Sequence, residues 1–231
     1  MQRFSHPRFE QATYLTISFL ILTLTGVLYS WDSTAFQRFL GPLNPFLVLF
    51  SLSTLGYALL LSLRRQAGFM IYRSGNTVSR LKELSIAILL AIMIAFVDLL
   101  AVFPADMNVL LPEALFYYSS FGYVVEVLFH LAPLWIILSV SRRLFKQKDW
   151  AIWGSILFVS LLEPIFQVAV GFSNPVPLWA SAYVGIHIFL INFQQIRIFK
   201  KFDFVSMYAF RLVYYLFWHI IWGNLRLDIL F

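Results

Sequence analysis

The sequence predicts an all-α protein, a polytopic membrane helical bundle of about seven transmembrane helices with one short interfacial helix. Of the 231 residues, 61% belong to the apolar and aromatic set AVILMFWYC and 12% are charged, and the mean hydropathy is +0.80. Soluble domains are about half apolar and about a quarter charged, so this chain is too apolar to be one of them. Because a membrane span needs about 20 apolar residues, spans and short connections use the whole length. We therefore predict a single integral membrane domain over residues 1–231.

The predicted spans follow one another along the chain with short connections. Each is an apolar run of near-spanning length. They cover residues 13–31, 46–63, 84–103, 120–141, 150–171, 179–193 and 204–225. Ser119 and Ser120 separate residues 110–118 from the fourth run. Residues 110–118 are therefore predicted to form the short interfacial helix.

The distribution of basic residues predicts the orientation. Most of the 17 Lys and Arg residues lie before the first span or in the second-to-third, fourth-to-fifth and sixth-to-seventh connections, which all fall on one side. Basic connections remain in the cytoplasm, so we expect a cytoplasmic N-terminus, an external C-terminus and a location in the cell (inner) membrane. The net charge of +6 follows from this topology. Membrane lipids are therefore the expected partners, and nucleic acid is not.

Ionisable side chains within apolar spans are candidate functional residues, because each costs roughly 3 kcal/mol to insert. Their spacing groups several of them on shared helix faces, at intervals of four residues. At a rise of about 1.5 Å per residue, five of these residues fall at one depth in the outer half of the membrane, and we call them the layer residues. The layer residues are Glu126, His130, Glu163, His187 and His219, and the same faces carry Gln167 and Tyr215.

Two further ionisable residues are predicted to lie apart from this layer. Arg211 falls nearer the cytoplasmic side, where we expect it to contact Asp203 or tyrosine hydroxyls. Asp98 falls near the outer end of its span, where we expect water to solvate it.

Pro133 and Pro164 follow two of the polar positions and remove backbone hydrogen bonds from their helices. Carbonyl groups freed at membrane depth need protein or water as partners. A water-containing cavity beside the predicted layer would supply them.

Several chemistries lack their residues in this sequence. The chain has no cysteine, which excludes disulfides and thiolate chemistry. It also has no HExxH zinc motif, no P-loop and no lysine within a span that could form a Schiff base. We predict no metal and no cofactor.

The polar stretches follow one another in an order found in a known family. The stretch Val125-Glu126-Val127-Leu128-Phe129-His130 precedes a basic loop at 142–148, the run 150–167, and a last helix that ends in Trp218-His219-Ile220-Ile221-Trp222-Gly223-Asn224. This order resembles the CAAX protease and bacteriocin-processing (CPBP) family. The resemblance implies a multi-helix membrane fold and an intramembrane peptidase with the motifs EExxxR, FxxxH and a final histidine helix. It covers residues 121–227.

The resemblance carries over only in part. Glu126 matches the second glutamate of EExxxR, with Val125 at the first glutamate and His130 at the arginine. Leu162 stands where FxxxH has its histidine, and Glu163 follows it. In the family the first glutamate and the FxxxH histidine activate water, and the last histidine and an asparagine assist the oxyanion. His219 matches that last histidine, and Asn224 lies one residue beyond the usual asparagine.

The candidate residues leave several functions open. A divergent peptidase acting on a peptide or transmembrane helix would use Glu126 or Glu163 as general base and His219 as polarising group. His130, Gln167, Asn224 and Tyr215 would then be supporting residues. The alternatives are a non-catalytic protein that binds a lipid, peptide or partner helix, and a proton or solute pathway. Glu126 and His130 could also serve only as an interhelical contact. A polar path to both faces would favour transport, and a cavity open on one side would favour a peptidase or a binding protein.

Overall fold

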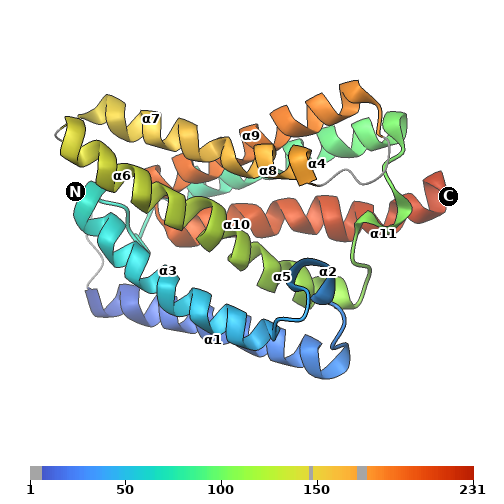
Figure 1. The fold of residues 1–231 in the computed structure, drawn as a ribbon, viewed down its shortest axis with the longest axis horizontal. Coiled ribbons are helices and arrows are strands. Elements are labelled where there is room, and N and C mark those ends of the chain that lie inside the picture. Colours follow the sequence, from blue (N-terminus) through green and yellow to red (C-terminus); the bar gives the residue numbers. More distant parts are fainter. Residues whose placement is uncertain (1–6, 146–147, 171–175) are drawn as a thin grey trace.

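The computed structural model describes residues 7–145, 148–170 and 176–231, and the fold is a bundle of long helices (Figure 1). No strand occurs in these residues. The helices are α1 (Pro7–Trp31), α2 (Gln37–Leu40), α3 (Pro45–Ala67), α4 (Thr77–Ala101), η1 (Ala105–Met107), α5 (Glu113–Val125), η2 (Glu126–Leu131), α6 (Ala132–Phe145), α7 (Asp149–Ser160), α8 (Leu162–Val170), α9 (Leu178–Lys201), α10 (Phe204–Tyr215), η3 (Leu216–Trp222) and α11 (Gly223–Leu230).

Six helices among the described residues are long and apolar enough to cross a membrane, which confirms the predicted all-α membrane bundle. Three of these six are composite, formed by α5, η2 and α6, by α7 and α8, and by α10, η3 and α11. Helix α9 is also long, with 24 residues, but its second half is polar and basic. The chain is an integral, multi-pass membrane protein, and the start of α1 and the end of α11 lie at opposite ends of the long axis (Figure 1).

The helix ends follow from local sequence signals. Helix α3 begins at Pro45, where the preceding Asn44 side chain accepts a hydrogen bond from the Leu47 amide, and it ends at Gly68 in a left-handed conformation. Asp203 caps α10 in the same way as Asn44 caps α3, because its carboxylate accepts from the Ser206 amide at 2.8 Å. These caps satisfy backbone groups that the helices leave without partners.

The predicted break at Ser119 and Ser120 is wrong. Helix α5 runs through both serines and continues into η2 and α6, so the interfacial helix predicted at 110–118 is not a separate element. Ser119 donates its hydroxyl proton to the Leu115 carbonyl oxygen one turn earlier, at 2.8 Å. A serine hydroxyl satisfied in this way is compatible with a continuous helix.

Both predicted proline positions coincide with irregular helix. Helix α7 ends at Ser160 and α8 begins at Leu162, because the ring of Pro164 clashes with a carbonyl four residues earlier. The π-helical segment η2 immediately precedes the helix that contains Pro133. A second π-helical segment, η3, surrounds His219. The predicted end of the fifth span at Gly171 lies outside the described residues.

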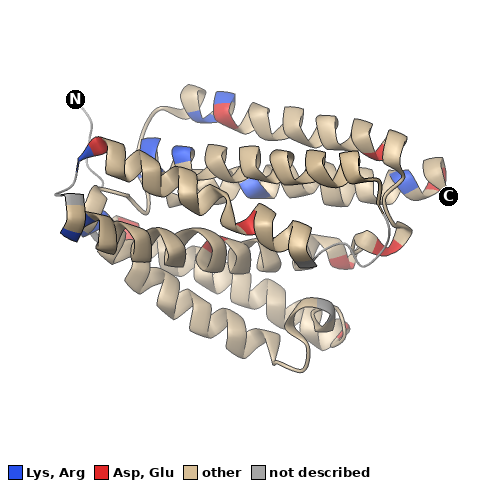
Figure 2. Cartoon of the chain, turned by 45° about the horizontal axis from the view of Figure 1, so that its top comes forward, with Lys and Arg blue, Asp and Glu red and all other residues tan. Residues whose placement is uncertain are grey.

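Lys and Arg residues lie mainly at the end of the bundle where α1 begins, which we call the basic end (Figure 2). There Glu83 of α4 pairs with Arg197 and Lys201 of α9, at 2.5 and 2.8 Å. At the opposite end, which we call the C-terminal end, Asp98 of α4 pairs with Arg226 of α11 at 2.6 Å. Helix α4 is therefore bound by ion pairs at both ends.

Asp98 is not solvated, contrary to the prediction. It is fully buried and accepts hydrogen bonds from the Arg226 guanidinium, the Trp222 indole and the Phe103 amide. Arg226 lies one residue beyond the last predicted span, and α11 brings this arginine against the end of α4. A buried carboxylate requires such a partner.

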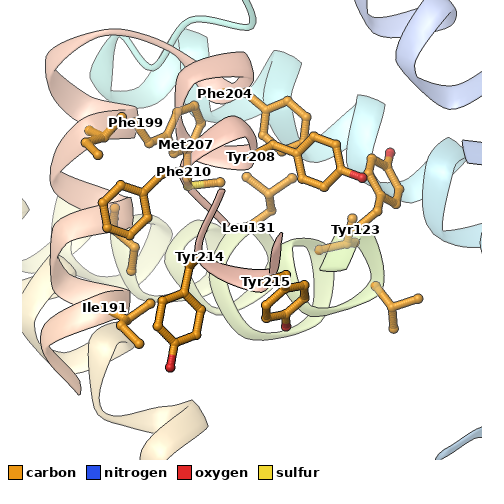
Figure 3. Packing of buried hydrophobic residues seen from close by; sticks show 14 of the residues in the cluster. Tyr123, Leu131, Ile191, Phe199, Phe204, Met207, Tyr208, Phe210, Tyr214 and Tyr215 are labelled. Carbon is orange, nitrogen blue, oxygen red and sulfur yellow. The ribbon is translucent and has the colours of Figure 1, made fainter. Parts of the chain in front are cut away.

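Helix α10 lies in the interior, against α4, α5 and α9, and aromatic side chains fill this region (Figure 3). The rings of Phe204 and Tyr208 are parallel, with centroids 6.2 Å apart. Tyr123 of α5 packs edge-on against both rings. This packing holds α10 in a fixed position among its neighbours.

Gly56 of α3 makes room for a pair of buried tyrosine hydroxyls. The Tyr14 hydroxyl is hydrogen bonded to the Ser53 carbonyl oxygen at 2.7 Å and to the Tyr123 hydroxyl. A Cβ atom on Gly56 would lie 2.7 Å from the Tyr14 hydroxyl and 3.2 Å from Val127 Cγ2. The close packing of α1, α3 and α5 therefore requires a glycine at this position.

We expect Gly56→Ala to lower the free energy of unfolding by about 1–3 kcal/mol, the usual cost of overpacking. Thermal unfolding in detergent measures the change. Adding Tyr14→Phe should recover part of the loss, since it removes the hydroxyl nearest to the new methyl group. Gly26→Ala is the matched control, because nothing lies within 4 Å of a Cβ at Gly26. Equal melting temperatures for the two glycine variants would contradict the packing argument.

Candidate functional site

Arg211 of α10 lies at the centre of a buried ionic cluster. Its Nε donates to Glu126 Oε1 at 2.7 Å, and its Nη2 donates to Glu163 Oε2 at 3.1 Å. Glu126 Oε2 lies 2.6 Å from His130 Nδ1, and because a carboxylate accepts, the imidazole donates here. One guanidinium therefore joins carboxylates from two other helices. We call Glu126, His130, Glu163, Asn192, Gln195 and Arg211 the Arg211 cluster.

Two amide side chains of α9 complete the cluster. Gln195 donates from Nε2 to Glu126 Oε1 at 2.5 Å and accepts from Arg211 Nη2 at 3.0 Å. Asn192 Oδ1 lies 3.5 Å from the same Nη2. Both amides are fully buried. Gln195 thus bridges the ion pair and fixes the orientation of its two charged groups.

Two predicted supporting residues lie at the edge of the cluster. The Tyr215 hydroxyl accepts from Arg211 Nη1 at 2.9 Å. Gln167 Nε2 donates to Glu163 Oε1 at 2.9 Å, one helical turn along α8. These contacts hold the arginine and the second carboxylate in place.

Irregular helix geometry positions the acidic residues. Glu126 begins the π-helical segment η2, which also contains His130. Glu163 follows the break between α7 and α8. π-helical turns occur often at functional sites, because they change the direction of side chains within a helix. The two irregularities therefore coincide with the residues that carry the charge.

The Arg211 cluster has one more carboxylate than permanent cations. Glu126, His130 and Arg211 are at most 2% exposed and Glu163 is 5% exposed, so water screens these charges little. With both carboxylates ionised, one Arg and a neutral His leave a net charge of −1. One proton, on His130 or on a carboxylate, makes the cluster neutral. Because a buried net charge is expensive, the presence of that proton decides what it costs to bury the cluster.

His130 Nε2 is the position available to that proton. It is buried without a hydrogen-bond partner among the described residues, and Glu163 Oε2 lies 4.0 Å away. Protonation at Nε2 would place an imidazolium N–H toward the second carboxylate. The geometry thus provides a proton-binding position between the two glutamates.

Arg211 belongs to this cluster, so its predicted separation from the layer residues and its predicted contact with Asp203 are wrong, whereas the predicted contact with a tyrosine hydroxyl is confirmed at Tyr215. The prediction used only the depth of its Cα position, whereas the long side chain reaches the two carboxylates. Asp203 instead pairs with Arg80 at 2.7 Å.

The structure separates two predicted layer residues from Glu126, His130 and Glu163. His219 Nδ1 lies 2.7 Å from Asn108 Oδ1, and its ring stacks on Tyr118 with centroids 4.6 Å apart. His187 Nε2 lies 3.3 Å from the Tyr214 hydroxyl. In the described part of the chain, neither histidine forms a hydrogen bond or ion pair with Glu126, His130 or Glu163.

Asn224 also lies apart from the cluster. Its Nδ2 donates to the Ile220 carbonyl oxygen, and its Oδ1 accepts from the Leu111 amide at 3.2 Å. These contacts tie the last helix to the connection between α4 and α5.

Sequence reasoning missed Gln195 because it ended the sixth span at Phe193, and it missed Asn192 although this residue lies within that span. The two residues are three apart, which places them on one helix face, and this spacing could have revealed them. Asn108 gave no such signal, because it lies outside the predicted spans and only the fold brings it to His219.

We expect Arg211→Gln to lower the free energy of unfolding by about 3–5 kcal/mol, because it leaves two buried carboxylates without their cation. Chemical or thermal unfolding in detergent measures the loss. Adding Glu126→Gln should recover part of it, since the remaining charge is then smaller. Arg142→Gln, at an exposed arginine of α6, is the control and should change stability little. Equal losses for Arg211→Gln with and without Glu126→Gln would contradict the charge-balance argument.

Comparison of the chain with protein-family models, curated proteins and solved structures finds no match. The resemblance to the CPBP family in the order of motifs therefore stays a prediction. Functional inference for this chain depends on the chemistry of the Arg211 cluster and its surroundings.

Proposed function

We propose that this protein conducts protons across the membrane and that the Arg211 cluster is the proton-binding site. The observation that carries the proposal is the buried excess of one carboxylate over permanent cations beside the unpartnered His130 Nε2. Ionisable groups within membranes are costly, and those that persist commonly serve proton relays. A site that is neutral with one proton and charged without it can bind a proton and release it.

Polar side chains on either side of the cluster support a pathway. Toward the basic end, α9 carries Gln195 in the cluster and Gln194, which donates to Glu83 at 2.6 Å. Toward the C-terminal end, Tyr215 accepts from Arg211 and packs edge-on against the His219 ring, with centroids 4.9 Å apart. A polar path toward both faces is the feature expected of transport.

We place the N-terminus and the basic end in the cytoplasm, in accordance with the positive-inside rule, and the protein in the cell (inner) membrane. Its exposed apolar side chains would contact lipid. Under this orientation the C-terminal end, with Asp98 and Arg226, faces outward.

We expect the purified protein, reconstituted in liposomes, to conduct protons when a potassium gradient and valinomycin impose a membrane potential. A pH-sensitive dye inside the liposomes measures the flux. Glu163→Gln should reduce the flux to that of empty liposomes, because Glu126 and Arg211 then balance without an added proton. His130→Gln should have the same effect, since it removes the proposed acceptor.

Glu113→Gln is the matched control for the loss of a glutamate. Glu113 lies in the first turn of α5, away from the cluster, so this variant should conduct like the wild type. Absence of flux in the wild type, or equal flux in the wild type and Glu163→Gln, would refute the proposed function.

A second candidate is the divergent intramembrane peptidase of the CPBP type. The observation in its favour is the approach of two glutamates from different helices to His130, with Glu126 at 2.6 Å and Glu163 at 4.0 Å. A carboxylate beside an imidazole can activate water. In this candidate the substrate is a peptide or a transmembrane helix, and Glu163 is the general base.

The peptidase candidate predicts cleavage of a synthetic transmembrane peptide by the reconstituted wild type. Mass spectrometry of the products measures it. Cleavage should be absent with Glu163→Gln and retained with Glu113→Gln, so the variants of the flux experiment also serve here. Flux without cleavage would favour the proton pathway, and cleavage without flux would favour the peptidase.

A further inference from the structure

The connection between α4 and α5, residues 102–112, is bound to the end of the last helix by several side chains. Arg226 donates to the Phe103 and Pro104 carbonyl oxygens at 2.5 and 2.9 Å. Asn224 accepts from the Leu111 amide. Together with the Asn108 contact to His219, these bonds place the connection against η3 and α11. We call residues 102–112 the α4–α5 connection.

Asn108 is the part of this connection that enters the bundle. It is 7% exposed, its Oδ1 lies 2.7 Å from His219 Nδ1, and the Tyr118 hydroxyl lies 3.3 Å from the same oxygen. Its Nδ2 is buried without a hydrogen-bond partner among the described residues. A buried amide that lacks a partner destabilises this position relative to one in water.

The first residue of the connection is also strained. Val102 has a φ of 49°, in the left-handed region that β-branched residues rarely adopt. Such a conformation is unfavourable and persists only where the surroundings enforce it. The strain of Val102 and the unpartnered amide of Asn108 both favour movement of the connection away from the bundle, and the bonds to Arg226 and His219 oppose it.

His219 lies between this connection and the Arg211 cluster. Its ring packs against Tyr215, whose hydroxyl accepts from Arg211. The same ring contacts Tyr118, Tyr214 and Trp218. Asn108 covers the polar edge of the imidazole on the side of the connection. Access from the C-terminal end to the Nδ1 atom of His219 therefore requires Asn108 to move.

We propose that His219 and Asn108 form the access site through which the Arg211 cluster exchanges its proton with the C-terminal end, closed while the α4–α5 connection is bound to the last helix. This inference rests on the proposed proton function and adds the site that controls it. His219 is the polar group reached from outside when Asn108 withdraws. The ion pair of Asp98 with Arg226 holds the connection in the closed position.

The structure offers a direct way to fix the connection. The chain has no cysteine, so introduced thiols are the sole thiols present. A Cβ on Gly223 would lie 3.3 Å from Asn108 Cβ, close to the roughly 3.5–4.5 Å that separates Cβ atoms in disulfides. The double variant Asn108→Cys with Gly223→Cys can therefore form a disulfide that joins the connection to α11.

The experiment measures proton flux in liposomes for this double variant before and after oxidation with copper phenanthroline. We expect oxidation to reduce the flux to that of empty liposomes and dithiothreitol to restore it. The two single cysteine variants are the matched controls, and oxidant should not change their flux. Mass spectrometry confirms the disulfide. Asn108→Ala, which removes the contact to His219, should conduct at least as fast as the wild type.

Each alternative outcome has a distinct meaning. Unchanged flux in the double variant with the disulfide formed would overturn the access site and leave the proton function of the Arg211 cluster standing. Failure of the disulfide to form would contradict the position of the connection and overturn the access site as well. Absence of flux in the wild type would refute the proposed function itself.

Discussion

A buried guanidinium must be paired, and the interior of this bundle is arranged around that requirement. Arg211 is buried, so Glu126 and Glu163 come from two other helices to balance its charge, and Gln195 fixes their orientation. A charge in this position is tolerated in a membrane only with such partners. The positions of η2, α8 and α9 around α10 follow from these contacts.

The ends of the bundle are organised by the same constraint. Glu83 and Asp98 lie near opposite ends of α4, and each pairs with basic residues of another helix, Arg197 and Arg226. Helix α4 is thereby connected to α9 at one end and to α11 at the other. Between them, aromatic packing around α10 keeps the Arg211 cluster away from lipid.

Proton binding and peptide hydrolysis make different demands on the same residues. A proton site needs a group that is neutral with the proton and charged without it, and the excess carboxylate beside His130 meets this demand. Hydrolysis needs in addition a polarising group at the reacting carbonyl, and His219, predicted for this role, is instead held by Asn108. The arrangement of the two histidines is therefore the reason to favour proton movement over catalysis.

The sequence by itself determined the membrane class, the approximate spans and the grouping of Glu126 with His130, because hydropathy and helical spacing are local properties. It did not reveal that Arg211 joins these residues, that Asp98 is buried, or that Asn108 reaches His219. Those contacts join residues 85, 128 and 111 positions apart in the chain. Only the tertiary structure decided them, because helix packing and the reach of long side chains select partners that no local pattern encodes.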